Sequence, residues 1–318
     1  MKKFLAIILI FLLMFIVTGG LWKVQTSPVS SDENARVIVI PKSEGISSIA
    51  KRLKDDNLIR SELTFKIYAR QNNLASRIQA GSFKLSPSMS ISEIANVLTS
   101  GTDDVWVTFI EGWRVEEMAE KLNGNLKIDN GQFLKLSKEG YMFPDTYLFP
   151  KDAEVEYITE TLQDNFNRKY ADDLKKKIKA KGLTEKEGVI LASLVEREGR
   201  SDKVRTEVAG ILLNRLNIGM KLDVDATVQY ALGYQQSEKS WWKRHITKDD
   251  KEIKSPYNTY KNPGLPPAPI CNPSLSSLEA VANANPNTQY LYYYHDSKGN
   301  SHYGKTLEEH LENVANNP

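Results

Sequence analysis

The pattern of apolar and polar residues predicts that the chain opens with a membrane-spanning helix. Residues 4–22 carry no charge and are rich in Ile, Leu and Phe. A helix rises about 1.5 Å per residue, so this segment reaches about 28 Å, close to the hydrocarbon thickness of a bilayer. Lys2 and Lys3 precede it, and positive charge favours the cytoplasmic side. We therefore expect residues 1–3 to be a cytoplasmic tail and the rest of the chain to lie outside the cell membrane.

A cleaved signal peptide is the alternative for residues 4–22. The apolar core of a signal peptide is usually shorter, and no Ala-x-Ala cleavage site follows Val17. We therefore expect an uncleaved, single-pass anchor. The polar, Ser-rich residues 23–35 are then expected to form a short tether.

Short periodic segments after the tether predict a small α+β module over residues 36–101. Arg36–Ile40 alternates as a strand does, and the next apolar residues, at positions 46, 49, 50 and 53, repeat at helical spacing. The remaining elements expected in this module are a helix over residues 62–71, a strand over residues 79–85 and a helix between Ser90 and Gly101.

Residues 102–318 are predicted to form a larger, mixed α+β domain. The long connection over residues 233–269 is rich in aromatic residues and Pro, and its aromatic content argues against disorder. The other elements expected in this domain are strands over residues 105–110 and 290–294, and helices over residues 115–122, 154–179 and 206–218.

One predicted helix of this domain ends on a carboxylate. Thr184 and Glu187 have the spacing of a capping box, so a helix should begin there. The residues that follow are apolar on every side, which is typical of a buried helix, and Glu196 comes directly after them. Burial and the negative end of the helix dipole disfavour a charged carboxylate. We therefore expect Glu196 to stay protonated near neutral pH and to suit general acid catalysis. The alternative is that Glu196 is only the first solvated residue after a buried helix.

Composition argues against several classes of function. The 318 residues have a formal net charge of +2, which indicates no nucleic-acid-binding surface. Cys271 is the only cysteine, so no intrachain disulfide can form, and its place in a Pro-rich loop does not suggest a nucleophile. The histidines show no zinc-binding spacing. We therefore expect no metal and no cofactor.

Two short motifs match catalytic signatures but lack the rest of their context. Residues 299–306 fit the P-loop pattern, yet only 12 residues follow them, too few for the further strands of a nucleotide-binding sheet. A β-hairpin followed by a capped helix explains them better. Ser48 and Lys51 fit the Ser-x-x-Lys pattern of penicillin-interacting enzymes, but the companion motifs Ser-Asp-Asn and Lys-Thr-Gly are absent.

Seven short segments carry a family resemblance through their order along the chain. They are Gly140–Tyr147, Leu194–Glu198, Asn214–Leu216, Asp225–Tyr230, Ser255–Tyr260, Gly264–Pro267, and His302 with Glu309 and His310. Each is modest alone, but together they strongly resemble the endolytic murein transglycosylases of the YceG-like family over roughly the whole chain. The sequence departs from the family at Ala226, where Pro is usual, and at Ala268 and Ser274, where Gly is common, which bears on loop geometry.

The resemblance implies a membrane-anchored enzyme that cuts nascent peptidoglycan strands internally during cell-wall assembly. Cleavage falls between N-acetylmuramic acid and N-acetylglucosamine and leaves a 1,6-anhydro end, which could terminate strand elongation. Penicillin-binding cell-wall synthases are candidate partners. The catalytic Glu of the family maps onto Glu196. Residues 36–101 resemble a LysM module, whose role is either glycan binding or purely structural.

A lytic transglycosylase needs no water nucleophile, because the C6 hydroxyl of the muramic sugar attacks its own C1. One carboxyl group can therefore act twice, with Glu196 protonating the leaving oxygen and then accepting the C6 hydroxyl proton. Short polar side chains and aromatic faces suit the binding of sugars. The residues expected in this role are Asp225, Thr227, Gln229, Tyr257 and Asn258. The alternative is that the segments around Asp225 and Asn258 are turns that only shape the cleft.

Two other functions stay open at this point. A hydrolytic muramidase on the same scaffold would need a second carboxylate, such as Glu198 or Asp225, and would leave reducing ends. A non-catalytic glycan-binding scaffold that organises cell-wall synthases would not depend on Glu196.

Overall fold

The computed structural model describes residues 14, 17–100 and 104–317. The predicted cytoplasmic tail and most of the predicted anchor, residues 4–13 and 15–16, lie outside this part of the chain. Residues 17–26 are helical. Within the described ranges, no helix has both the length and the apolar character needed to cross a bilayer.

The chain divides into two compact units, residues 1–105 with 148–151, and residues 106–147 with 152–318. The elements of the first unit are β1 (Arg36–Ile40), α2 (Ile46–Asp55), α3 (Glu62–Gln71), the 3-10 helix η1 (Leu74–Ser76), β2 (Gly81–Leu85) and α4 (Ile91–Ser100). The two strands pair antiparallel, with Ile38 opposite Phe83. Both of these side chains are buried in one apolar core with residues of the three α-helices, because alternate strand positions face the same side. The elements predicted for residues 36–101 are present, and the LysM-like character of the unit stays a prediction.

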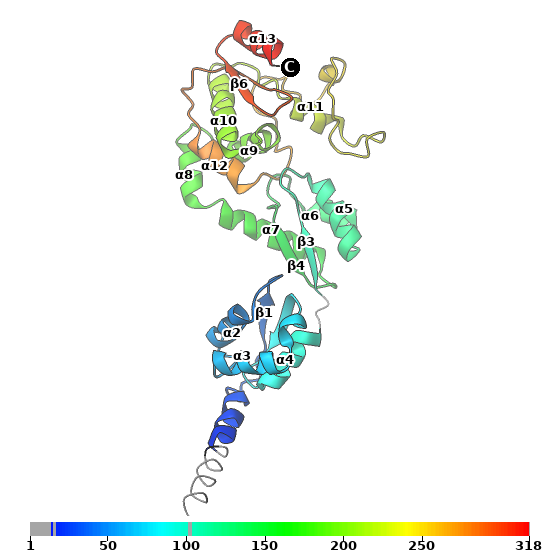
Figure 1. Cartoon of the computed structure of the whole chain (residues 1–318). Coiled ribbons are helices and arrows are strands. Elements are labelled where there is room, and N and C mark those ends of the chain that lie inside the picture. The colour runs from blue at the N-terminus through cyan, green and yellow to red at the C-terminus, as the bar shows by residue number, and fades with distance from the viewer. Residues whose placement is uncertain (1–13, 15–16, 101–103, 318) are drawn as a thin grey trace, which may run out of the picture. The chain divides into compact units, whose positions relative to one another are not determined.

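The rest of the chain is mostly helical, with short strands between the helices (Figure 1). Every sheet in the described residues is two-stranded, and the pairs are β1–β2, β3–β4 and β5–β6, so the predicted α+β class is confirmed. The remaining elements are β3 (Val105–Thr108), α5 (Val115–Leu126), α6 (Asn130–Leu136), β4 (Thr146–Phe149), α7 (Val155–Lys169), α8 (Asp172–Lys179), α9 (Glu185–Glu198), α10 (Asp202–Asn217), α11 (Asp225–Leu232), the 3-10 helix η2 (Asp250–Glu252), α12 (Leu275–Asn283), β5 (Tyr292–His295), β6 (Ser301–Gly304) and α13 (Leu307–Asn316).

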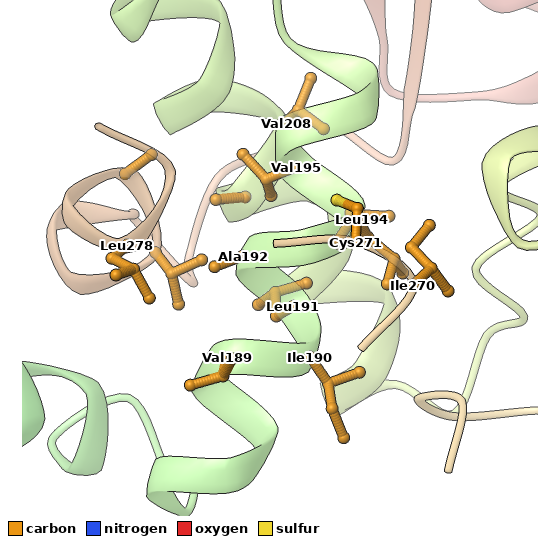
Figure 2. Close-up of a cluster of buried hydrophobic side chains, with 14 of the residues drawn as sticks. Val189, Ile190, Leu191, Ala192, Leu194, Val195, Val208, Ile270, Cys271 and Leu278 are labelled. Atoms are coloured by element: carbon orange, nitrogen blue, oxygen red, sulfur yellow. The ribbon is translucent and has the colours of Figure 1, made fainter. Parts of the chain in front are cut away.

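Helix α9 runs through the core of the second unit. Its capping box forms as predicted, with the Thr184 side chain accepting from the backbone N–H of Glu187 and the Glu187 carboxylate accepting from that of Thr184. Residues 188–195 are all buried. Figure 2 shows their side chains leaving the helix on several sides, toward Leu278 of α12 on one flank and toward Ile270 and Cys271 on the other. Because α9 is buried on every side up to Val195, its last three residues lie at the edge of the core.

The single long helix predicted over residues 154–179 is two helices, α7 and α8. The break falls at Tyr170, which is 3% exposed and packs on Phe166 at 5.4 Å between ring centroids. Its hydroxyl donates to the carbonyl oxygen of Glu185 at 3.2 Å. The tyrosine is therefore drawn into the core beside the start of α9, and its ψ of 62° takes the backbone out of the helix.

Asn272 connects three segments of the second unit through its side chain. It is completely buried. Its Oδ1 accepts from the backbone N–H groups of Gly140 and Met142, both at 2.9 Å, and its Nδ2 donates to the carbonyl oxygen of Trp113 at 3.1 Å and to Glu139 Oε1 at 3.0 Å. The side chain thus satisfies buried backbone groups that no regular element supplies with partners.

Two glycines in helices are expected to respond oppositely to replacement by alanine. In α10, a Cβ on Gly210 would lie 2.8 Å from the carbonyl oxygen of Asn285, whereas a Cβ on Gly124 in α5 would meet nothing within 4 Å. Alanine favours a helix by about 1 kcal/mol over glycine, but forcing atoms into a packed contact costs about 1–3 kcal/mol. Gly210→Ala should therefore destabilise the protein and Gly124→Ala should stabilise it, as measured by urea unfolding. A Gly210→Ala variant as stable as the wild type would contradict the close contact between α10 and Asn285.

Candidate active site

The carboxylate of Glu196 is surrounded by hydrogen-bond donors. Its side chain is 4% exposed, and Oε1 pairs with the guanidinium of Arg205 at 3.1 Å. Oε2 accepts from the backbone N–H of Ser274 at 2.8 Å, from the Ser274 hydroxyl at 2.5 Å and from the Ser277 hydroxyl at 2.7 Å. Ser274 is the N-cap of α12, so Glu196 lies at the positive end of a helix dipole.

These contacts come from elements other than α9. Both oxygens accept hydrogen bonds, Oε1 from Arg205 and Oε2 from the serine groups of α12. The expectation for Glu196 rested on burial and on the C-terminal dipole of α9. The opposing N-terminus of α12 and the side chain of Arg205 come from other parts of the chain. Glu196 joins the ends of α9, α10 and α12 and has little surface left for a ligand.

Glu198, two residues further along α9, lies on a cavity of about 460 Å³. Tyr293 of β5 donates its hydroxyl to Glu198 Oε2 at 3.1 Å. The charged and titratable residues around this cavity come from many elements and include Glu198 on α9, Arg215 on α10, Asp223 before α11, Asp225 on α11, Tyr260 on the long loop, Tyr293 and His295 on β5, and His310 on α13.

Burial raises the pKa of Glu198 to about 7, with a smaller contribution from the charge of Asp225. The hydrogen bond from Tyr293 acts in the opposite direction. A carboxyl group with a pKa near 7 is partly protonated at neutral pH, so it can both donate and accept a proton. Glu198 therefore has the properties that the sequence led us to expect of Glu196.

Asp225 is the predicted sugar-binding residue that reaches this cavity. It is the first residue of α11, and its side chain is 52% exposed. Oδ1 accepts from the Tyr260 hydroxyl at 2.6 Å and pairs with the Lys251 ammonium at 2.9 Å, and Lys251 also donates to the Tyr260 hydroxyl at 2.8 Å.

Thr227 and Asn258 have internal roles and offer no surface to a sugar. Both are completely buried. The Thr227 hydroxyl lies 2.9 Å from that of Thr259 and donates to the carbonyl oxygen of Val224. Asn258 donates to the carbonyl oxygens of Lys251 and Ile253, both at 2.9 Å. The alternative interpretation, in which the segments around Asp225 and Asn258 shape the cleft, therefore fits both residues.

Gln229 and Tyr257 do not line the Glu198 cavity either. Gln229 is half-buried and donates to the carbonyl oxygen of Lys243 at 2.6 Å. Tyr257 packs on Tyr230 with ring centroids 4.7 Å apart. Both residues hold the long loop against α11, so of the predicted sugar contacts only Asp225 is brought together with Glu198.

Cation–aromatic contacts hold the loop over residues 233–269 in place. The guanidinium of Arg114 lies 4.1 Å from the ring centroid of Tyr230 and 4.8 Å from that of Trp241, and the guanidinium of Arg197 lies 3.8 Å from that of Trp242. Contacts of this kind contribute about 0.5–2 kcal/mol each. The loop is therefore anchored directly beside the end of α9, as its aromatic content indicated.

The P-loop pattern is a hairpin, as expected. Residues 296–300 turn between β5 and β6, with Asp296 Oδ1 accepting from the backbone N–H groups of Lys298 and Asn300. Thr306 then caps α13. Across the part of the chain that the structure describes, no group of three or more His, Cys, Asp or Glu side chains is arranged to hold a metal ion.

Glu198 could have been found by the reasoning that led to Glu196. It follows Leu194 and Val195 by four and three residues, and both are buried, so it shares a helix face with them. The local sequence around Tyr293 and Arg215 gives no such indication. Both reach the Glu198 cavity only through the tertiary arrangement of β5 and α10.

Comparison with known proteins gives consistent results. The sequence profile described as the YceG-like family matches residues 38–316. The chain is 32% identical to an endolytic murein transglycosylase of Bacillus subtilis, across 93% of this chain and 89% of that protein. It is 29% identical to one of Streptococcus pneumoniae across 99% of this chain, and it spans 65% of the length of that longer protein. A crystal structure of a yceG-like protein from Listeria monocytogenes matches 88% of this chain and 99% of its own, with 28% identity and a TM-score of 0.60.

Proposed function

Because the chain belongs to the YceG-like family, we propose that it is an endolytic peptidoglycan lytic transglycosylase that cleaves between N-acetylmuramic acid and N-acetylglucosamine and leaves 1,6-anhydro ends. The family predicted from the ordered segments is confirmed. The relatives named above support the enzyme class, and the cavity at Glu198 supplies a carboxyl group suited to the reaction.

Membrane anchoring belongs to the same proposal. The uncharged residues 4–22 behind two lysines support a single-pass anchor with the enzyme outside the cytoplasmic membrane. We further propose that cleavage of nascent strands ends their elongation and that penicillin-binding synthases are partners, with the LysM-like residues 36–101 as a glycan-binding or supporting module.

Protonated Glu198 carries the chemistry in this proposal. It donates its proton to the glycosidic oxygen as the bond from that oxygen to C1 of the muramic sugar breaks. The C6 hydroxyl of the same sugar then bonds to C1, and the Glu198 carboxylate accepts its proton. The group returns to its starting state, and no water is consumed. Because one group serves as acid and then as base, a pKa of about 7 suits both steps.

Product mass tests the reaction type. The full-length protein in detergent micelles is incubated with purified peptidoglycan, and the fragments are analysed by mass spectrometry. Internal fragments lighter by one water than hydrolysis products are expected. Fragments with reducing ends would instead favour the hydrolytic muramidase. That reaction needs a second carboxylate, and Asp225 lies on the same cavity as Glu198. Absence of cleavage by a folded, glycan-binding protein would favour the scaffold.

Tyr293→Phe is expected to move the alkaline limb of the pH–rate profile upward. The Tyr293 hydroxyl lowers the pKa of Glu198, so its removal raises that pKa and keeps the acid protonated to higher pH. A hydrogen bond of about 1 kcal/mol corresponds to a shift of roughly 0.7 pH units. Tyr290→Phe is the control, because its hydroxyl makes no contact with Glu198. A profile for Tyr293→Phe that coincides with the control would contradict the contact.

A further inference from the structure

We propose that the carboxylate of Asp225 is a second catalytic group, which stabilises the positive charge that develops at C1, and that Lys251 and Tyr260 are positioning residues that hold it in place. This inference rests on the proposed function, because it assigns roles within the same cleavage. It goes beyond sugar binding, since it gives Asp225 an interaction with the transition state rather than with a hydroxyl group.

The contacts of Asp225 use only one of its two oxygens. Tyr260 and Lys251 both reach Oδ1, at 2.6 and 2.9 Å. In the part of the chain that the structure describes, Oδ2 accepts no hydrogen bond, and Asp225 lines the same cavity as Glu198. The carboxylate is therefore held from one side and keeps an oxygen available to a ligand.

The charges around the two carboxyl groups differ in a way that suits separate roles. Asp225 pairs with the Lys251 ammonium group and accepts the Tyr260 hydroxyl. Glu198 is half-buried, accepts one hydroxyl and has the Asp225 charge as a neighbour, and desolvation raises its pKa to about 7. A carboxylate paired with a cation, beside a carboxyl group with a raised pKa on the same cavity, is the arrangement that glycosidic cleavage uses for a stabiliser and an acid.

A structural role alone does not account for these contacts. Asp225 occupies the first turn of α11, where a negative charge stabilises a helix by about 0.3–1 kcal/mol. That role needs neither Lys251 nor Tyr260, which come from the loop over residues 233–269 and converge on the same oxygen. The loop thus supplies both groups that orient the carboxylate.

The test compares Asp225→Asn, Asp225→Glu and Lys251→Met with the wild-type full-length protein in kcat, KM and pH–rate profile on glycan strands. Asp225→Asn should lower kcat about 100-fold, the order found when one group that stabilises a transition-state charge is removed, while KM changes less than threefold. Asp225→Glu should recover part of kcat because it keeps the charge. Lys251→Met should lower kcat about tenfold.

The pH–rate profile separates catalysis from folding. The Asp225 charge raises the pKa of Glu198, so Asp225→Asn should move the alkaline limb to lower pH, whereas Asp249→Asn, an exposed neighbour on the same loop, should leave it in place. The inference is overturned if Asp225→Asn keeps kcat within threefold, or if its profile coincides with that of Asp249→Asn. A wild-type protein that makes no anhydro ends would overturn the proposed function itself, and this inference with it.

Discussion

Glu198→Gln is expected to lower peptidoglycan cleavage by about 10³-fold, because glutamine keeps the shape of the side chain but can neither donate nor accept the reacting proton. Glu196→Gln should retain far more activity. Its amide nitrogen replaces an oxygen that accepts hydrogen bonds from Arg205 or from the serine donors of α12, so its main effect should be a loss of stability of about 1–3 kcal/mol.

The pH dependence of the free energy of unfolding gives a second test of the role of Glu198. The pKa of Glu198 is raised in the folded protein, from 4.5 to about 7. A group of this kind contributes stability that is fully present below pH 4.5 and is lost as the pH rises through 7. Glu198→Gln avoids that loss, so it should be more stable than the wild type at pH 8 by about 2–3 kcal/mol. The opposite pattern, with Glu196→Gln inactive and Glu198→Gln active, would return the catalytic role to Glu196.

The second large effect is expected at Asn272, where alanine should destabilise the protein by about 3–5 kcal/mol. The substitution removes five side-chain hydrogen bonds and leaves the N–H groups of Gly140 and Met142 and the carboxyl group of Glu139 short of partners. Each buried polar group left without a partner costs about 1–3 kcal/mol. Urea unfolding of the variant checks the value.

Asn283→Ala provides the matched control for Asn272→Ala. Asn283 ends α12 and is exposed, and its Oδ1 accepts a hydrogen bond from the Lys177 ammonium at 3.3 Å. Its loss should therefore change stability by less than about 0.5 kcal/mol. Similar effects at the two asparagines would mean that Asn272 does not connect its three segments.

Local patterns predicted the parts of the fold that depend on neighbours in sequence. The capping box at Thr184 and Glu187 and the hairpin over residues 292–304 rest on contacts within a few residues. The burial of α9 could be predicted because its own sequence is apolar on every side. The single helix over residues 154–179 failed because the tertiary burial of Tyr170 overrode helix propensity.

The site was predicted less well because its chemistry depends on distant contacts. Burial at the end of α9 could be inferred. The surroundings of its two glutamates, however, are set by residues distant in sequence. Ser274 contacts Glu196 from 78 residues away, and Tyr293 contacts Glu198 from 95 residues away. Asp225 was identified as a ligand contact, yet its partners Lys251 and Tyr260 were not, because nothing in their local sequence indicates where the long loop lies.

The distance in sequence between Glu198 and Tyr293 has a consequence during protein synthesis. A chain made from its N-terminus contains the reactive carboxyl group well before β5, which supplies the tyrosine and part of the cavity wall. Until β5 is in place, Glu198 is open to water and lacks the burial that raises its pKa. An incomplete or C-terminally truncated chain therefore carries the carboxyl group without a working acid, and a protein that cuts the cell wall becomes competent only when it is whole.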